Sequence, residues 1–499
     1  MESENQQRVE ALNARAVNCA RSGQTLQAEQ LWSQALQLDP DAIAIRSNLA
    51  RLFFQLGRFQ SVLNLTDGLD HESPVPAALA ALIGQAALRC HLPALALRWL
   101  SIAERARPNE PSLLLSMSEA LLASGLVDRS VALLNELVNR YPEALEPRLN
   151  LAIAKTESGT IDQAATLYAS LLSHWSEHPA VLLNAARFHC DYGDRNLARR
   201  LVEDLIRIDP QSRAARLLLA DLCLHGGQLE QAQATWQMLL EHDPMDQEAY
   251  LPLIFTALDQ QDWNAAAKQL QQAFSHCQGQ SLTRLFAAWF DLPPDIREAY
   301  FPQWSTDPLL CVQQHQLIQP DDPLLMQWIT WLKADSSLIV DRPGKPTVGG
   351  MQSHELFNRL DDRLSQCLMD RLSPVVSTYR QELKNHSSLF ASLSGATITR
   401  FSGWGVVLRQ GGKQIRHTHP EAEISGVLYL NIPANIGSND TGNEGALWFS
   451  PHPGFRQSVD GLTVIPKPGL LVLFPSFLPH ETIPFVSEED RICIAFNVC

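Results

Sequence analysis

Three histidines and one arginine near the C-terminus have types and spacing that could bind a metal and an anion. His417 and His419 are one residue apart, so in an extended segment their side chains share a face. Two imidazoles side by side on a rigid strand suit a borderline metal such as iron or zinc. His480 follows in the chain, and Arg491 comes eleven residues after it. A small β-barrel with a metal near its mouth and an arginine one strand further in would use this order.

Apolar and aromatic strand-forming residues surround these side chains. The segment 414–417 leads into the histidine pair, 424–431 follows it, and a last run begins at Arg491. The polar segment 437–444 is expected to be a loop. Nine such runs with Gly, Pro and Asn turns between them favour a barrel or a double-sheet jelly roll. The expected strands cover residues 396–401, 405–408, 414–417, 424–431, 445–449, 462–466, 470–474, 480–485 and 491–498.

Several ordered motifs lie in this part of the chain. H-x-H-P at 417–420 runs into S-G-V-x-Y at 425–429, and F-P-S-x-x-x-H at 474–480 precedes R-x-x-x-A-F-N at 491–497. Upstream, G-x-Q-S-x-x-L-F stands at 350–357. Together these motifs resemble a bacterial and phage branch of the 2-oxoglutarate/Fe(II)-dependent dioxygenases, whose core is a double-stranded β-helix, or jelly roll. The resemblance covers residues 339–499.

The resemblance implies an Fe(II) ion held by three protein ligands, with open positions for a chelating 2-oxoacid and dioxygen. The usual ligands are two histidines and a carboxylate, but here His419 stands where most members have an aspartate. Two assignments follow. The ligands are His417, His419 and His480, or Glu421 replaces His417 in an H-x-E arrangement. We favour the first, because the branch keeps both histidines. Aspartyl/asparaginyl β-hydroxylases, which also carry tetratricopeptide repeats, work with histidine ligands alone.

The same resemblance assigns residues to the cosubstrate, 2-oxoglutarate. Arg491 would form a bidentate pair with its distal carboxylate, a task that suits a planar guanidinium better than a lysine. Its alternative role is a surface charge after an acidic turn. Tyr429 and Cys493 occupy positions where relatives assist that cosubstrate, although Tyr429 could equally be a core residue. We expect no catalytic residue beyond the metal and cosubstrate ligands.

The first half of the chain is repetitive. Glycine recurs with a period of 34 at 23, 57, 125, 159, 193 and 227, while slots 91 and 261 hold His and Gln. Proline and alanine recur with the same period, which is the pattern of the tetratricopeptide repeat. We expect about eight units over residues 9–276, stacked into a solenoid. Its groove is predicted to capture a protein or peptide; the alternative is a spacer or a self-association surface.

A proline-rich connector is expected between the two parts. Residues 277–338 lose the period of 34 but keep helical patches at 282–290 and 324–332. Their Trp, Phe and Leu content would be costly to leave in water, so we expect a packed connector with short helices. Residues 354–385 are predicted to form one or two helices that buttress a sheet, with their apolar face at Leu356, Leu360, Leu364 and Cys367.

Composition bounds the partners and the compartment. A net charge of −15 without clustered Lys and Arg argues against nucleic-acid binding. No apolar run approaches the length of a membrane span, and the polar N-terminus does not resemble a signal peptide. The nine cysteines lack C-x-x-C spacing, which suits free thiols in a reducing cytoplasm.

These observations predict an α+β multidomain protein, in which an α-solenoid of tetratricopeptide repeats precedes a double-stranded β-helix (jelly roll). The resulting hypothesis is a cytoplasmic Fe(II)/2-oxoglutarate-dependent oxygenase that hydroxylates a protein or peptide side chain presented by the repeats. Two alternatives stay open. One is a non-catalytic repeat scaffold with a degenerate jelly roll, and the other is an oxygenase that acts on a small molecule.

Overall fold

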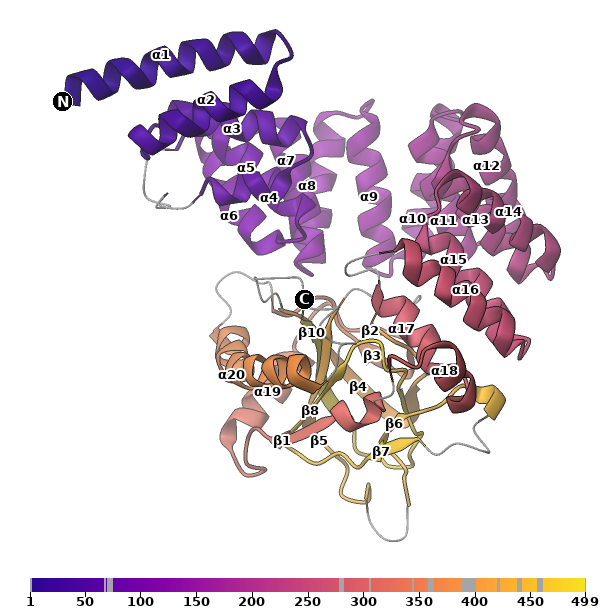
Figure 1. Ribbon diagram of the computed structural model, residues 1–499. Helices are drawn as coiled ribbons and strands as arrows, with labels where there is room; N and C mark the ends of the chain where they lie inside the picture. The colour runs from indigo at the N-terminus through magenta and orange to yellow at the C-terminus, as the bar shows by residue number, and fades with distance from the viewer. Residues whose placement is uncertain are drawn as a thin grey trace. The chain divides into compact units, whose positions relative to one another are not determined.

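The fold is that of a computed structural model, shown in Figure 1. It describes residues 2–66, 69, 75–277, 282–304, 307–342, 345–357, 363–386, 401–419, 422–437, 442–455 and 461–498. The chain divides into two compact units, Met1–Ser158 and Gly159–Cys499. The second unit contains both repeat helices and the β-structure, so this division does not follow the predicted borders. The predicted domains 9–276, 277–338 and 339–499 stay a prediction.

The first unit consists of helices that pack in antiparallel pairs, each burying small and aliphatic residues against its neighbours. These helices are α1 (Glu2–Arg21), α2 (Thr25–Leu38), α3 (Ile43–Gln55), α4 (Phe59–Asn64), α5 (Ala77–Arg89), α6 (Pro93–Ala106), α7 (Pro111–Ala123), α8 (Val127–Arg140) and α9 (Leu145–Glu157). The second unit begins with α10 (Ile161–His174), α11 (Pro179–Tyr192), α12 (Arg195–Ile208), α13 (Arg213–His225), α14 (Leu229–His242), α15 (Gln247–Asp259) and α16 (Trp263–His276).

The glycine period reflects a left-handed backbone position after alternate helices. Five of the six periodic glycines have φ between 71° and 76°, a region that glycine enters without steric cost. The two slots without glycine keep the conformation, because His91 and Gln261 have φ of 56° and 59°. Gly193 is the exception, with φ of −136° after α11. The repeat geometry therefore overrides the residue preference at slots 91 and 261.

The connector contains the short helices that the sequence predicts, and a strand that it does not. Helix α17 has the predicted bounds, Leu282–Phe290, and is followed by α18 (Pro294–Tyr300) and α19 (Pro323–Lys333). Between α18 and α19, β1 (Gln313–Gln316) pairs antiparallel with β8 (Leu470–Pro475) and forms one edge of the main sheet. Its polar sequence, QQHQ, gave no apolar strand signal, as is usual for an exposed edge.

Two antiparallel sheets form the C-terminal β-structure, in agreement with the predicted jelly roll. The larger sheet has the order β1-β8-β5-β10-β4-β3-β2 and the smaller one β7-β6-β9. The further strands are β2 (Ile339–Val340), β3 (Thr347–Gln352), β4 (Phe401–Gln414), β5 (Ile424–Asn431), β6 (Leu447–Phe449), β7 (Leu462–Val464), β9 (Glu481–Thr482) and β10 (Arg491–Val498).

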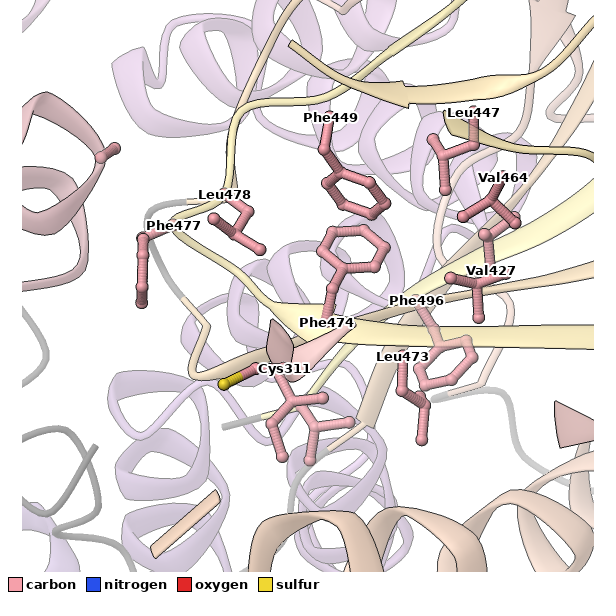
Figure 2. Packing of buried hydrophobic residues seen from close by; sticks show 14 of the residues in the cluster. Cys311, Val427, Leu447, Phe449, Val464, Leu473, Phe474, Phe477, Leu478 and Phe496 are labelled. Atoms are coloured by element: carbon pink, nitrogen blue, oxygen red, sulfur yellow. The ribbon is translucent and has the colours of Figure 1, made fainter. Parts of the chain in front are cut away.

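The core lies between the two sheets and continues beneath the helices. Phe449 of the small sheet packs edge-on against Phe474 of the large sheet, with ring centroids 4.9 Å apart (Figure 2). On β4, Gly405 faces Leu332 of α19 so closely that a Cβ would meet the leucine side chain. Helix α20 (Arg363–His386) is anchored by the Tyr379 hydroxyl, which donates to the Cys311 carbonyl at 2.8 Å.

Several predicted strand bounds were wrong. β5 and β10 have the predicted bounds, but 405–408 and 414 belong to one continuous strand, β4. Pairing with β3 carries β4 through its polar Gly411-Gly412 stretch, with a register shift between Val348 and Gly350. The strand 480–485 is reduced to Glu481–Thr482, and residues 396–400 lie outside the described residues.

The helix predicted over 354–385 starts later than expected. α20 begins at Arg363, so Leu356 lies outside it, and Leu360 lies outside the described residues. The reason is local: the Leu356 amide donates to the Gly403 carbonyl at 2.7 Å, which ties this segment to β4 instead. Among the described residues, no helix combines the length and the apolar composition needed to cross a membrane.

Candidate metal and cosubstrate site

The three candidate metal ligands come together. One ring nitrogen each of His417, His419 and His480 lies within 4.8 Å of the others. The ring centroids are 4.9 Å apart for His417 and His419, and 4.3 Å apart for His417 and His480. This spacing lets three imidazoles bind one ion. The alternative ligand Glu421 lies outside the described residues.

Backbone pairing holds this cluster together. His417 and His480 form an isolated antiparallel bridge, in which each amide donates to the other's carbonyl at 3.0 Å. The His419 amide donates to the Ser476 carbonyl at 3.0 Å. The three side chains therefore start from backbone positions that are fixed relative to one another, as a preformed metal site requires.

Backbone carbonyls also set the ring orientation of two histidines. Nδ1 of His417 lies 2.7 Å from the Ile415 carbonyl, and Nδ1 of His480 lies 2.9 Å from the Leu478 carbonyl. Because a carbonyl only accepts, both Nδ1 atoms carry the proton, and both Nε2 atoms keep a lone pair for a metal.

All three rings are neutral near pH 7. Burial lowers the pKa of His417 to about 4. Burial also lowers the pKa of His419 and of His480 well below the ordinary value, and the neighbouring histidines add to this effect. Metal ligation needs neutral imidazole, so the cluster meets that requirement without losing protons.

Arg491, Tyr429 and Cys493 form a second group in the same interior. Cys493 pairs with Tyr429 across β10 and β5, so their side chains share a face, and Arg491 lies two residues before Cys493 on that face. The Arg491 guanidinium lies 5.0 Å from the centre of the Tyr429 ring, and its Nε donates to the Gly445 carbonyl at 3.0 Å. Its Nη1 lies 3.9 Å from the Cys493 sulfur.

This group has the vacant hydrogen-bonding capacity that an anionic ligand needs. Arg491 is only 2% exposed, yet it forms no ion pair with an acid among the described residues. The buried Tyr429 hydroxyl has no hydrogen-bond partner in the described structure. Burial raises the pKa of Tyr429 well above its ordinary value, so the hydroxyl keeps its proton and can donate. A dicarboxylate such as 2-oxoglutarate would satisfy both groups.

Burial raises the pKa of the Cys493 thiol, although Arg491 opposes the shift. The thiol therefore stays protonated. A weak S–H donor offers the cosubstrate less than a hydroxyl would, so Cys493 contributes mainly volume to this group.

Motif residues with no assigned role in the sequence buttress the histidine cluster. The Ser425 hydroxyl shares hydrogen bonds of 2.9 Å with the Ser476 hydroxyl and the Asn497 amide oxygen. Ser476 also holds the His419 amide. These three polar residues therefore link strands β5, β8 and β10 beside the metal ligands.

Trp404 is a further residue of the site, and its sequence context gave no sign of this role. Its ring centroid lies 5.4 Å from that of His419, and its buried indole N–H has no hydrogen-bond partner in the described structure. Trp404 pairs with Ala495 in the register that pairs Val406 with Cys493, so it shares the face of Cys493. A tryptophan in an apolar strand gives no signal of this kind in a single sequence.

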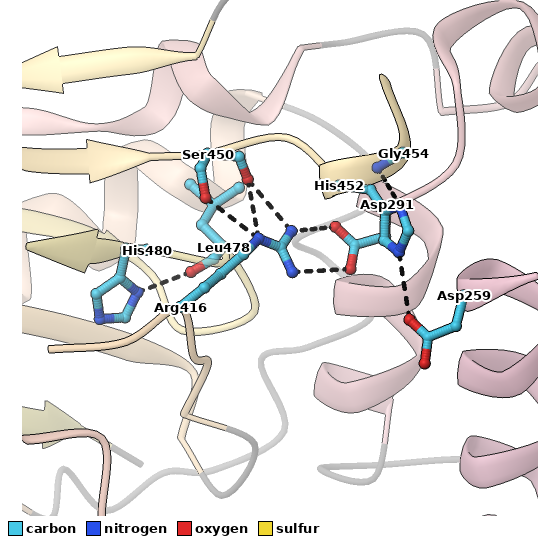
Figure 3. Close-up of polar contacts among 8 residues, drawn as sticks. All are labelled: Asp259, Asp291, Arg416, Ser450, His452, Gly454, Leu478 and His480. Atoms are coloured by element: carbon cyan, nitrogen blue, oxygen red, sulfur yellow. Dashed lines mark hydrogen bonds and ion pairs between the residues drawn. The ribbon is translucent and has the colours of Figure 1, made fainter. Parts of the chain in front are cut away.

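A polar network on the other side of the histidine segment was also missed (Figure 3). Arg416 forms a bidentate ion pair with Asp291, which directly follows α17, and its Nε donates to the Ser450 hydroxyl at 3.2 Å. His452 lies 3.7 Å from the Asp259 carboxylate and packs edge-on against Trp263. These contacts tie the last repeat helices to the β-structure beside His417.

Comparisons with known proteins agree with this architecture. Residues 402–497 match the family model described as "Putative 2OG-Fe(II) oxygenase", and residues 20–86, 155–214 and 191–254 match a tetratricopeptide repeat model. Tetratricopeptide repeat models thus match the N-terminal part of the chain, and a model described as a putative oxygenase matches its C-terminal part. The description of the oxygenase model implies Fe(II) and 2-oxoglutarate, and the histidine cluster could bind a metal.

Similar solved structures cover the repeats. A tetratricopeptide repeat protein from Parabacteroides merdae is 14% identical, with a TM-score of 0.43, over 46% of this chain and 92% of its own. A thermophilic repeat protein from Thermus thermophilus is 21% identical, with a TM-score of 0.32, over 35% and 94%. YrrB, described as having an unusual peptide-binding site, is 18% identical, with a TM-score of 0.29, over 40% and 98%. No curated protein matches the chain.

Proposed function

We propose that this protein is an Fe(II)/2-oxoglutarate-dependent oxygenase that hydroxylates a protein or peptide side chain bound by its repeats. The observation that carries the proposal is that one β-sandwich contains both a cluster of possible metal ligands and a buried arginine that could bind an anion. Each of the three neutral imidazoles offers one ring nitrogen to a metal. The buried Arg491 has no acidic partner among the described residues.

His417, His419 and His480 would hold the iron. Three facial protein ligands leave positions for a bidentate 2-oxoacid and for dioxygen. Bound Fe(II) supplies the oxidising chemistry: dioxygen, 2-oxoglutarate and a C–H bond become succinate, carbon dioxide and a hydroxylated product. The protein's own residues orient these reactants and exclude water.

Arg491 would bind the distal carboxylate, while Tyr429 donates its hydroxyl hydrogen bond to it. Both groups sit on strands of the large sheet, so their positions are fixed before the ligand arrives. Arg491 also keeps its Nε bond to Gly445, which leaves the outer edge of the guanidinium for the ligand. The unpartnered Trp404 indole beside His419 is a further donor for a ligand at the metal.

A protein substrate follows from the repeats. Solenoids of stacked helix pairs present an extended surface on which polypeptides bind. The free thiols of the described cysteines are consistent with the predicted cytoplasmic location, which stays a prediction.

The test is an anaerobic titration of the full-length protein with Fe(II) and 2-oxoglutarate. We expect the weak visible charge-transfer band of the chelate to appear at one equivalent of each. His480→Ala should abolish the band at the same metal concentration, and Arg491→Ala should shift its 2-oxoglutarate midpoint at least about 100-fold. A folded, metal-loaded protein that gives no band would leave the scaffold hypothesis in its place.

A second titration separates the two ligand assignments. Glu421→Gln removes a carboxylate ligand but keeps the size of the side chain, whereas His417→Ala removes the imidazole. Loss of the band in the first variant alone would assign Glu421 as a ligand. Loss in the second alone supports the three-histidine site.

A further inference from the structure

A cavity of about 530 Å³ lies within the second unit, on the wall formed by its repeat helices. Its lining comes from alternate helices, α11, α13, α15 and α17, and from Thr418 of the histidine segment. The intervening helices α12, α14 and α16 contribute no lining residue. Stacked alternate helices therefore form one continuous surface that ends at the residue between His417 and His419.

The floor of this cavity is apolar. Leu217, Leu251 and Phe255 line it, and Phe255 remains 38% exposed although it is a large aromatic residue. Pro252 lies inside α15 and also lines the cavity. Because proline has no N–H, the carbonyl of Glu248 lacks its usual partner one turn later. Apolar surface in a concave site suits the side chains of a polypeptide.

The walls carry both arginines and acids. Arg187, Arg213 and Arg284 line the cavity, against two acids, Asp221 and Glu248. Arg213 is neutralised, since it donates to Asp246 at 2.6 Å and to Glu248 at 2.8 Å. Neither Arg187 nor Arg284 forms an ion pair with a described residue. Asp221 on the same wall balances one of these two charges at most, so the cavity keeps two arginine side chains that are available to an anionic ligand.

Arg284 marks the end of the cavity beside the candidate metal site. The preceding residue, Thr283, donates its hydroxyl to the Ala422 carbonyl at 3.3 Å, just beyond the histidine pair. Thr418 alternates with His417 and His419, so the cavity contacts this segment on the face opposite the imidazoles.

We propose that this cavity binds an extended segment of the polypeptide substrate, with an acidic side chain at Arg284. That side chain and the residue that reaches the histidines belong to the same bound segment. Apolar side chains between the two arginines rest on Leu217, Leu251 and Phe255. This inference rests on the proposed function for the role of the bound segment, but the binding itself needs neither metal nor cosubstrate.

The experiment measures binding to metal-free, full-length protein in the presence of a chelator. The probes are libraries of fluorescent, end-blocked dodecapeptides, each with one residue type fixed at a central position and the rest randomised. We expect the Asp and Glu libraries to bind at least tenfold tighter than the Lys and Arg libraries at low salt. The preference should fall as the ionic strength rises.

Charge-reversal variants test which arginines cause the preference for acidic peptides. Arg284→Glu and Arg187→Glu should abolish or reverse it, whereas Arg200→Glu should leave it unchanged. Arg200 is exposed on α12, outside the cavity lining, so that control makes the same change in net charge. Arg284→Gln keeps a side chain of similar polarity, and its melting curve checks that Arg284 is not needed for folding.

Three outcomes overturn the proposal. The libraries bind equally, or none binds up to about 1 mM, or the acidic preference survives Arg284→Glu in a folded protein. Because the chelated protein carries no iron, each of these outcomes is independent of the Fe(II)/2-oxoglutarate titration. That titration can fail while acidic peptides still bind, and then the cavity belongs to a scaffold.

Discussion

Two largely buried arginines of the second unit, Arg416 and Arg491, differ in their partners. Arg416 is saturated: Asp291 takes both ends of its guanidinium, and Ser450 accepts from its Nε. Arg491, which is more deeply buried, has one strong hydrogen bond, to Gly445, and no acid among the described residues. A buried cation without an anion is costly, so such a position persists where a ligand supplies the anion. Arg416 is therefore a structural residue, and Arg491 is a candidate binding residue.

The largest effect should come from breaking the saturated pair. Asp291→Ala leaves Arg416 without its counter-ion, and we expect a loss of about 3 kcal/mol of stability, near the lower end for buried pairs because Arg416 is partly exposed. Thermal unfolding of the full-length protein measures this loss. The control is Glu203→Ala, which breaks the exposed Arg199–Glu203 pair and should cost less than about 0.5 kcal/mol. Equal effects of the two changes would contradict the structural role of Arg416.

The next effect should appear only in ligand binding. Arg491→Ala is expected to weaken 2-oxoglutarate binding about 100-fold, or about 2.7 kcal/mol, because the distal carboxylate loses its cation. Calorimetry on protein loaded with a redox-inert divalent metal measures this directly. Binding of the metal itself should stay within about twofold of the wild type, which separates the two halves of the site.

A smaller effect on the same binding is expected from Tyr429→Phe. This change removes one buried hydroxyl and keeps the ring that stacks under Arg491. We expect about a tenfold loss of 2-oxoglutarate affinity, the usual magnitude for a hydrogen bond to a charged group. Unchanged affinity would mean that Tyr429 is a core residue, which is the alternative that its sequence context allowed.

The smallest effect on stability is expected from replacing Arg491, in contrast to the loss expected when Arg416 loses its partner. Arg491→Met replaces the unpaired cation with an apolar side chain of similar length. In the absence of cosubstrate, its melting temperature should differ from wild type by the equivalent of less than about 1 kcal/mol, since the lost Gly445 hydrogen bond offsets the relief of desolvation. A loss as large as that of Asp291→Ala would show that Arg491 is structural.

The fold was largely predictable where a local sequence pattern determines the backbone conformation. Five of the six periodic glycines have φ near 70°, and His91 and Gln261, which fill the two slots without glycine, share this conformation. The apolar strands β5 and β10 have the bounds that their composition predicts. Three strands were missed, β1, β2 and β3. They owe their structure to pairing with β8, β3 and β4, respectively, instead of to their own residues.

The candidate site also has a part that was predictable from the sequence and a part that was not. The spacing of His417, His419 and His480 predicted a cluster, and the structure brings these three side chains together. The Arg416–Asp291 pair joins residues 125 positions apart, so no local pattern could reveal it. The cavity was equally hidden, because its residues come from four separate helices. Long-range pairing is the information that one sequence lacks.

The burial of helix α17 has a consequence for hydrogen exchange. All nine of its residues except Arg284 are buried, and they share one core with both the last repeats and the β-sheets. Amides of α17 can therefore exchange with solvent mainly when that shared core opens, an event that also dismantles the ligand site. Saturating ligand at about 100 times its dissociation constant would slow this exchange about 100-fold. Deuterium uptake by α17 would therefore report how much of the protein has ligand bound at the site in the β-sheets.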